Sequence, residues 1–287
     1  MQFPIRQIEF DEFPPLLREI PDLPRSLYIR GVLPSEPQVF LCVVGSRACS
    51  PYGKRLVQSL ILGLTGYPVT IVSGLAMGID AEAHKAALDA GLTTVAVLPS
   101  SCDDASIYPS INHALAQKIL ARGGALISEY KAPTKPMRHS FAERNRIMAG
   151  ISLATLIIEA EEKSGTLITA RLALDYNREV LAIPHEIGKV SGAGVNRLIR
   201  EGATLVRSSE DILTALNIKH EEKSDDASFP TDLHKSELKI LELLTEPLVK
   251  DEMIERLELN AQEISIMLSS LLIRGLIRER LGKIERV

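Results

Sequence analysis

Short apolar runs alternate with amphipathic stretches from Val39 to about residue 216. The runs lack polar alternation, which is typical of strands that helices cover on both faces. The candidate strands are Val39–Val44, Val69–Val72, Thr93–Leu98, Ala125–Ser128, Leu153–Glu159 and Glu179–Ile183, and the candidate helices lie at about 51–64, 80–90, 110–121, 142–150, 165–176 and 193–200. This alternation predicts an α/β domain with a doubly wound, mainly parallel sheet.

The first 38 residues do not follow this pattern, because they are rich in proline, at positions 4, 14, 15, 21, 24, 34 and 37. Proline fixes φ and has no backbone N–H to donate, so it interrupts regular hydrogen-bond ladders. We therefore expect residues 1–38 to form an irregular, proline-rich arm packed on the domain of residues 39–216.

A second change of pattern occurs near the C-terminus. Residues 217–235 are polar, charged and without a hydrophobic period, which indicates a linker. In residues 236–287, leucine and isoleucine recur at spacings that suit three short amphipathic helices. Asn260 is expected to cap the third helix, and the segments Leu276–Ile277 and Lys283–Val287 can pair as a hairpin. Three helices and a hairpin predict a small winged-helix-like domain.

Composition narrows the class of protein. Of the 287 residues, 45% are hydrophobic and 24% are charged, which is ordinary for a globular protein. No run approaches the roughly 18 apolar residues of a membrane span, and charged residues interrupt the first twenty positions, where a signal peptide would be apolar. Three cysteines without CxxC spacing provide no disulfide framework. We therefore expect a cytoplasmic protein without membrane contact.

Three candidate strands end in small or hydroxylated residues, at points where a helix is expected to begin: Gly45-Ser46-Arg47, Ser73-Gly74 and Ser164-Gly165-Thr166. Because ligands bind beyond the carboxyl ends of parallel strands, we expect these loops to converge on one site. Free N–H groups and the helix dipole favour anions there, which predicts a phosphate-binding edge. The alternative is that these residues only form tight turns. Neither a GxGxxG nor a GxxxxGK[ST] motif is present.

The most basic segment, residues 131–147, follows the fourth candidate strand. It holds five basic residues and one acidic residue, although the net charge of the whole chain is −4. Cations for phosphates beside a ring for a base are what single-stranded nucleic acid requires. The candidate contacts in this segment are Lys135, Arg138, Phe141, Arg144, Asn145 and Arg146. In the alternative interpretation, Phe141 packs inward and Arg144 or Arg146 pairs with Glu143 or Glu159.

Taken together, these segments resemble the DNA-processing protein A family (DprA, also called Smf). The similar pieces are Val43–Arg47 with Tyr52-Gly53, Ile71–Asp80 with His84, Tyr108-Pro109, Ser128-Glu129, Phe141–Ile147, Glu159-Ala160, Ser164–Leu167, Pro184, Asn196–Ile199 and the arm residues Phe13–Gly31. The resemblance extends over about residues 13–216. The chain departs from the family at Pro184-His185, where relatives commonly have Pro-Gly, and at Pro99–Asp104, which adds two acids.

This resemblance implies an extended Rossmann-like domain that binds single-stranded DNA without catalysis, with no cofactor and no metal. Members of the family protect incoming strands during natural transformation, help to load the RecA recombinase on them and usually work as homodimers. By position, the DNA pocket would involve Ser46, Arg47, Gly74 and the basic segment. Charge reversal at Arg47 or Arg144 is then expected to abolish DNA binding while the protein stays folded.

An enzyme with a related fold is the main alternative. Nucleotide phosphoribohydrolases of the lysine-decarboxylase-like group have a GGxGTxxE motif, of which Gly165-Thr166 keeps the centre while Thr169 occupies the position of the catalytic glutamate. Glycosidic cleavage needs a carboxylate near the sugar, and Glu129 and Glu159 are expected to pair with nearby arginines instead. The six histidines also lack the spacing of a zinc site.

The C-terminal domain is expected to contact protein, or DNA weakly through its wing, rather than to read a duplex sequence. The start of the third helix, Asn260–Glu263, holds no cation, although a recognition helix normally contacts bases there. Residues 247–287 contain seven basic and seven acidic residues, so this domain has no net attraction for phosphate.

Overall fold

The computed structural model describes residues 3–35, 37–219, 235–244, 248–257, 260–273, 276–280 and 283–286. The chain forms two compact units, Met1–His220 and Glu221–Val287. Most of the linker expected at residues 217–235 lies outside the described residues. No helix in the described ranges is long and apolar enough to cross a membrane.

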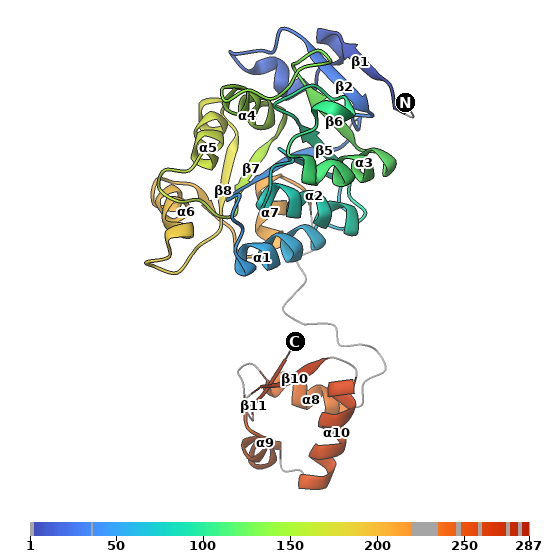
Figure 1. Cartoon of the computed structure of the whole chain (residues 1–287). Helices are drawn as coiled ribbons and strands as arrows, with labels where there is room; N and C mark the ends of the chain where they lie inside the picture. The colour runs from blue at the N-terminus through green and yellow to red at the C-terminus, as the bar shows by residue number, and fades with distance from the viewer. Residues whose placement is uncertain are drawn as a thin grey trace. The chain divides into compact units, whose positions relative to one another are not determined.

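The larger unit is built on a nine-stranded sheet with the strand order β1-β2-β6-β5-β4-β3-β7-β8-β9 (Figure 1). The strands are β1 Ile5–Ile8, β2 Leu27–Gly31, β3 Val39–Val44, β4 Val69–Ser73, β5 Thr94–Val97, β6 Ala125–Ser128, β7 Ala154–Ile157, β8 Glu179–Ala182 and β9 Thr204–Leu205. All neighbouring pairs from β6 to β9 in this order are parallel. The predicted doubly wound, mainly parallel sheet is therefore confirmed.

Helices cover both faces of this sheet (Figure 1). One face carries α1 Pro51–Leu62, α2 Ile79–Asp89, α3 His113–Ala121 and α7 Ser209–Ala215, and the other carries α4 Ser140–Ile151, α5 Thr166–Asp175 and α6 Val190–Arg200. In β3, Leu41 and Val43 pack on the first layer, while Cys42 and Val44 pack on the second. Burial on both faces explains why the strands read as unbroken apolar runs.

The proline-rich arm is more regular than the sequence predicts. β1 pairs antiparallel with β2, and β2 pairs antiparallel with β6, so the arm extends the sheet. Two short 3-10 helices, Phe10–Glu12 and Pro15–Glu19, lie between the two strands. The expectation of an irregular arm is wrong because the prolines lie outside the two strands. Each strand falls between prolines and keeps its backbone N–H donors.

The order of strands places a topological switch at β3. The chain proceeds outward from β3 through β4 and β5 to β6, and then returns to place β7 on the other side of β3. The loops after β3 and β7 therefore diverge to opposite faces, which opens a crevice at the carboxyl edge of the sheet. Ligands of open α/β sheets bind in such crevices.

The smaller unit contains α8 Lys235–Leu243, α9 Lys250–Leu257, α10 Ala261–Ile273 and an antiparallel hairpin of β10 Ile277–Arg280 with β11 Lys283–Arg286. Its core contains Ile240, Met253 and Leu271. Oδ1 of Asn260 accepts a hydrogen bond from the Glu263 N–H at 2.8 Å, so the predicted cap is confirmed. The order of three helices and a hairpin is as expected, while the winged-helix class stays a prediction.

Candidate nucleic-acid interface

A cavity of about 350 Å³, here called the Arg47 pocket, opens at the carboxyl edge of the sheet beside the topological switch. The predicted site residues in its lining are Gly45, Ser46, Arg47, Arg138, Phe141, Arg144, Asn145, Ser164, Gly165 and Thr166. They come from the β3–α1 loop, from α4 with the residues before it, and from the start of α5. Ten of the fourteen predicted residues therefore lie around one cavity.

A cation and a ring in the lining of this pocket contact each other, and a second ring packs against the first. The guanidinium carbon of Arg47 is 5.3 Å from the centroid of the Phe141 ring. The Tyr108 ring meets Phe141 edge-on, with centroids 5.7 Å apart and an interplanar angle of 76°. Arg47 and Tyr108 are exposed and Phe141 is half-buried, so the alternative in which Phe141 packs inward is not observed. The arrangement offers a charge for a phosphate and ring surface for a base.

Arg144 lies beneath the pocket as part of its floor. It is only 4% exposed, and its Nη1 donates a hydrogen bond to the Val97 carbonyl at 2.5 Å. A Cβ at Gly74 would lie 1.9 Å from the same Nη1, so residue 74 must be glycine for Arg144 to occupy this position. Burial lowers the pKa of Arg144, and the nearby Asp80 carboxylate opposes this effect. Arg144 thus lines the pocket and Gly74 leaves room for it, while a direct contact of either residue with DNA stays a prediction.

Asp80 is the acidic member of the same floor. Its carboxylate accepts a hydrogen bond from the Gly74 N–H at 3.1 Å, and burial raises its pKa. Ser73, fully buried next to Gly74, donates its hydroxyl hydrogen to the Val43 carbonyl at 2.7 Å and does not line the pocket. The predicted pair Ser73-Gly74 thus holds the β4–α2 loop in place.

The beginning of α1 already holds an anion from the chain itself. Glu159, fully buried at the end of β7, accepts hydrogen bonds from the backbone N–H of Ser50, at 3.0 Å, and from its hydroxyl. Ser50 also caps α1, since its Oγ accepts the Gly53 N–H at 3.0 Å. Glu159 therefore pairs with the helix start and not with an arginine, contrary to the sequence-based expectation.

The beginning of α5 differs from that of α1. Gly165, at the N-cap position, makes no side-chain cap, and the Thr166 N–H donates to the Ser164 Oγ at 3.2 Å. A Cβ added at Gly165 would meet no atom within 4 Å, which shows open space beside this helix start. Together with the lining cations Arg47 and Arg138, it makes a suitable seat for a phosphate.

Two predicted contacts lie apart from the pocket. Lys135 is exposed and does not line it. Arg146 donates to Glu129 at 2.5 Å and lines a separate cavity that Glu143 also borders. Arg144 and Arg146 are two positions apart on α4, so helical geometry directs their side chains to different sides. The expected contact of Arg146 with DNA therefore has no support from its position.

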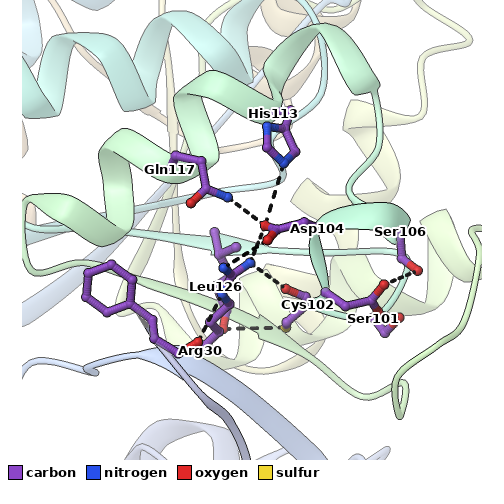
Figure 2. Close-up of polar contacts among 10 residues, drawn as sticks. Arg30, Ser101, Cys102, Asp104, Ser106, His113, Gln117 and Leu126 are labelled. Carbon is purple, nitrogen blue, oxygen red and sulfur yellow. Dashed lines mark hydrogen bonds and ion pairs between the residues drawn. The ribbon is translucent and has the colours of Figure 1, made fainter. Parts of the chain in front are cut away.

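Tyr108 was not selected from the sequence as a site residue. The residues just before it are anchored to the arm by the contact of Arg30 with Asp104 (Figure 2). Arg30 of β2, 2% exposed, donates to both carboxylate oxygens of Asp104, at 2.5 and 3.3 Å. Gln117 donates to Asp104 at 2.7 Å, and Nε2 of His113 lies 3.6 Å from it. The hydrogen bond from Arg30 holds the pKa of Asp104 below its usual value. Asp104, one of the two acids added by Pro99–Asp104, is thus paired within the protein although its side chain is 46% exposed.

The residues considered for glycosidic cleavage are all engaged or enclosed. Thr169, at the position of the catalytic glutamate, is 1% exposed, Glu159 is bound to Ser50, and Glu129 is bound to Arg146. In the part of the chain that the structure describes, no three His, Cys, Asp or Glu side chains group as a metal site.

This geometry defines a Rossmann-like protein with a cationic, ring-bearing pocket at the topological switch of its sheet. The chain belongs to the DNA recombination-mediator protein A family, whose model matches residues 5–217. The resemblance stated from the sequence is therefore confirmed.

Two curated relatives agree with this assignment. Protein Smf of Escherichia coli is 43% identical over 204 residues, which cover 71% of this chain and 54% of that protein. DNA processing protein DprA of Streptococcus pneumoniae is 41% identical over 212 residues, which cover 74% of each chain. The match thus spans about half the length of the Escherichia coli relative.

Solved structures of two relatives share the fold. DprA from Streptococcus pneumoniae superimposes with a TM-score of 0.69 at 38% identity, covering 77% of this chain and 76% of that one. DprA from Helicobacter pylori, described by its single-stranded DNA binding mode, gives a TM-score of 0.66 at 30% identity, covering 75% of this chain and 96% of that one.

Proposed function

We propose that the protein binds single-stranded DNA in the Arg47 pocket. The observation that carries this proposal is the Arg47–Phe141 pair, 5.3 Å apart, beside the start of α5. A phosphate would lie between Arg47, Arg138 and the N–H groups of α5, and a base would lie against Phe141 or Tyr108. A single strand can present both groups at once, whereas a duplex hides the faces of its bases. The single-stranded DNA binding mode of the Helicobacter pylori relative supports the same ligand.

Charge reversal at Arg47 tests this site. Arg47 is exposed, so Arg47→Glu should leave the melting temperature unchanged and weaken binding to oligo(dT) by about tenfold or more, since it replaces a phosphate contact with a like charge. Lys118→Glu makes the same charge change at the far end of α3 and is the matched control. Gel shifts with oligo(dT) and with a duplex of equal length measure both affinities. Equal oligo(dT) binding by Arg47→Glu and wild type would contradict the assignment.

We further propose that the protein acts in the cytoplasm as a homodimer, protects incoming DNA during natural transformation and helps RecA to load on it. Membership of a recombination-mediator family supports this role. RecA-dependent strand exchange on DNA coated with single-strand-binding protein tests it. Wild type should accelerate the reaction and Arg47→Glu should not. Equal rates with and without the protein would reject the loading role, and a monomeric mass in solution would reject the homodimer.

In this proposal the protein acts by binding and not by catalysis. Thr169 occupies the position of the catalytic glutamate, Glu159 is bound to Ser50 and Glu129 is bound to Arg146. These features support the proposal because glycosidic cleavage needs a carboxylate beside the sugar. Incubation with nucleoside monophosphates, followed by chromatography of free bases, tests the alternative. Release of base by wild type above the level of an Arg47→Glu control would favour the enzyme.

A further inference from the structure

A second cavity, of about 520 Å³, lies at the same carboxyl edge of the sheet. We call it the Tyr52 pocket, and the lining residues that matter here are Ser50, Tyr52, Arg55, Glu159, His185 and Lys189. They belong to the first turns of α1, the end of β7 and the β8–α6 loop. None of the residues that line the Arg47 pocket lines this one.

Two aromatic side chains form one wall of the Tyr52 pocket. The rings of Tyr52 and His185 meet edge-on, with centroids 5.5 Å apart and an interplanar angle of 75°. Nε2 of His185 lies 2.7 Å from the Ile158 carbonyl, and the Asn196 amide bonds the His185 backbone at both its N–H and its carbonyl, each at 3.0 Å. A Cβ at Gly192 would lie 2.2 Å from the His185 Cβ, so the backbone of α6 packs directly on this side chain. His185 is therefore fixed in place, while Tyr52 stays 42% exposed and available for stacking.

The lining of the Tyr52 pocket holds two cations, Arg55 and Lys189, and two carboxylates, Glu159 and Glu186. Arg55 and Lys189 are exposed, and the ion pair of Lys189 with Glu186, at 3.5 Å, is exposed on both sides and therefore weak. Glu159 is fully buried and engaged with Ser50, so a ligand does not reach its carboxylate. An exposed ring, Tyr52, with two exposed cations in the same lining suits a nucleotide.

The two pockets adjoin each other along the edge of the sheet. In the β3–α1 connection, Arg47 lines the first pocket and Ser50 lines the second. In the β7–α5 connection, Glu161 lines the first and Glu159 the second. The same two connections thus border both cavities, so a strand that runs along them from the Arg47 pocket would reach the Tyr52 pocket.

We propose that the Tyr52 pocket is a second nucleotide subsite for the same DNA strand. A base stacks on the exposed part of Tyr52, and a flanking phosphate is held by Lys189 or Arg55. This inference rests on the proposed binding of single-stranded DNA in the Arg47 pocket.

Binding measured against strand length tests the proposal. A short oligo(dT) that fills only the Arg47 pocket should bind Tyr52→Ala and wild type equally. With longer oligo(dT), Tyr52→Ala should lose about fivefold to tenfold in affinity, because one stacking contact is missing. Tyr52→Phe keeps the ring and should bind like wild type. Lys189→Glu should show the same length dependence as Tyr52→Ala, whereas Lys118→Glu, at the far end of α3, should not.

The outcomes separate this inference from the proposed function. If Arg47→Glu loses binding while Tyr52→Ala binds every length like wild type, the second subsite is rejected and the first stands. If wild type binds no oligo(dT), or Arg47→Glu binds it normally, the proposed function fails. A loss by Tyr52→Ala that is equal at all lengths would also reject a second subsite.

Photo-crosslinking tests the proposal on the wild-type protein, without any substitution. Oligonucleotides with 5-bromodeoxyuridine should crosslink to the tryptic peptide of residues 48–54, in which Tyr52 is the aromatic residue. Crosslinks to the peptide with Phe141 and none to residues 48–54 would overturn the proposal. Crosslinking of residues 48–54 by free 5-bromodeoxyuridine monophosphate, but not by the oligonucleotide, would assign the pocket to a free nucleotide instead of the strand.

Discussion

Arg144 lies with its guanidinium group against the backbone of Gly74 and its Nη1 on the Val97 carbonyl. Charge reversal at this position, expected from the sequence to spare the fold, would bury a carboxylate beside Asp80 and a carbonyl oxygen, all of them hydrogen-bond acceptors. Arg144→Glu should therefore lower the free energy of unfolding by about 3–5 kcal/mol.

Urea unfolding followed by circular dichroism measures this effect. Arg47→Glu, the same charge change at an exposed position of the same pocket, should stay within about 0.5 kcal/mol of wild type. If both variants were equally stable, Arg144 could not be the buried floor that its 4% exposure indicates.

The Arg30–Asp104 pair gives a pH dependence with a defined sign. Because Arg30 lowers the pKa of Asp104 in the folded protein, the contribution of the pair is complete above about pH 4, the usual pKa of an aspartate. It is lost as the pH falls through the lower folded value. Asp104 is 46% exposed, so this titration contributes about 1 kcal/mol or less.

Asp104→Asn tests the sign. The variant should be less stable than wild type at pH 7, and the difference should shrink as the pH falls below about 4. Asp89→Asn, at the exposed end of α2, is the matched control. A difference between Asp104→Asn and wild type that is the same at pH 7 and pH 3 would contradict this account.

At the scale of elements, the beginnings of α1 and α5 differ in whether an anion already occupies them. The α1 start already holds the Glu159 carboxylate, whereas the α5 start has Gly165 with open space around it. Gly165→Asp would supply a carboxylate at the α5 start in the same way. Aspartate is a good N-cap, so stability should be equal or slightly higher, by up to about 1 kcal/mol. Affinity for oligo(dT) should nevertheless fall, by about tenfold, because the phosphate seat is taken.

Gly165→Ala separates charge from size in this test. It adds a methyl group to open space and no charge, so its affinity for oligo(dT) should equal that of wild type. A common loss in Gly165→Asp and Gly165→Ala would indicate that the glycine is needed for its backbone, and that α5 is not an anion seat.

The strands that helices cover on both faces could be predicted from the sequence. Unbroken apolar runs such as those of β3 and β7 are typical of strands in a covered parallel sheet. β9 and α7 were missed because both are short: β9 has two residues, both exposed, and α7 has seven. The convergence of the strand-end loops followed from the topology of a parallel sheet. The partners of individual charged residues could not be predicted from the sequence, because they lie far apart along the chain. Glu159 is hydrogen-bonded to Ser50 across 109 residues, and Arg30 to Asp104 across 74.

At the scale of the whole molecule, a net charge of −4 coexists with a cationic pocket. In the proposed binding mode few phosphates are contacted, so DNA binding should depend on salt only moderately. Each contact with a single strand contributes a slope of about −0.7 to log affinity against log salt. Arg47→Gln removes one cation without adding repulsion, and should make the slope shallower by about 0.7.

Affinities at several salt concentrations, measured with the full chain, give both slopes. Lys118→Gln, remote from the pocket, should keep the wild-type slope and serves as the control. An unchanged slope in Arg47→Gln would mean that Arg47 contacts a base and no phosphate, and that other groups bind the phosphates.

The buried carboxylate of Glu159 has a consequence for competition inside a cell. A helix start at the switch of such a sheet is where soluble dinucleotides commonly place their pyrophosphate, and here the chain fills that position itself. A soluble dinucleotide therefore finds no free anion-binding position at the start of α1. The start of α5 stays open to an anion, and in the proposed function that anion is a phosphate of the DNA strand.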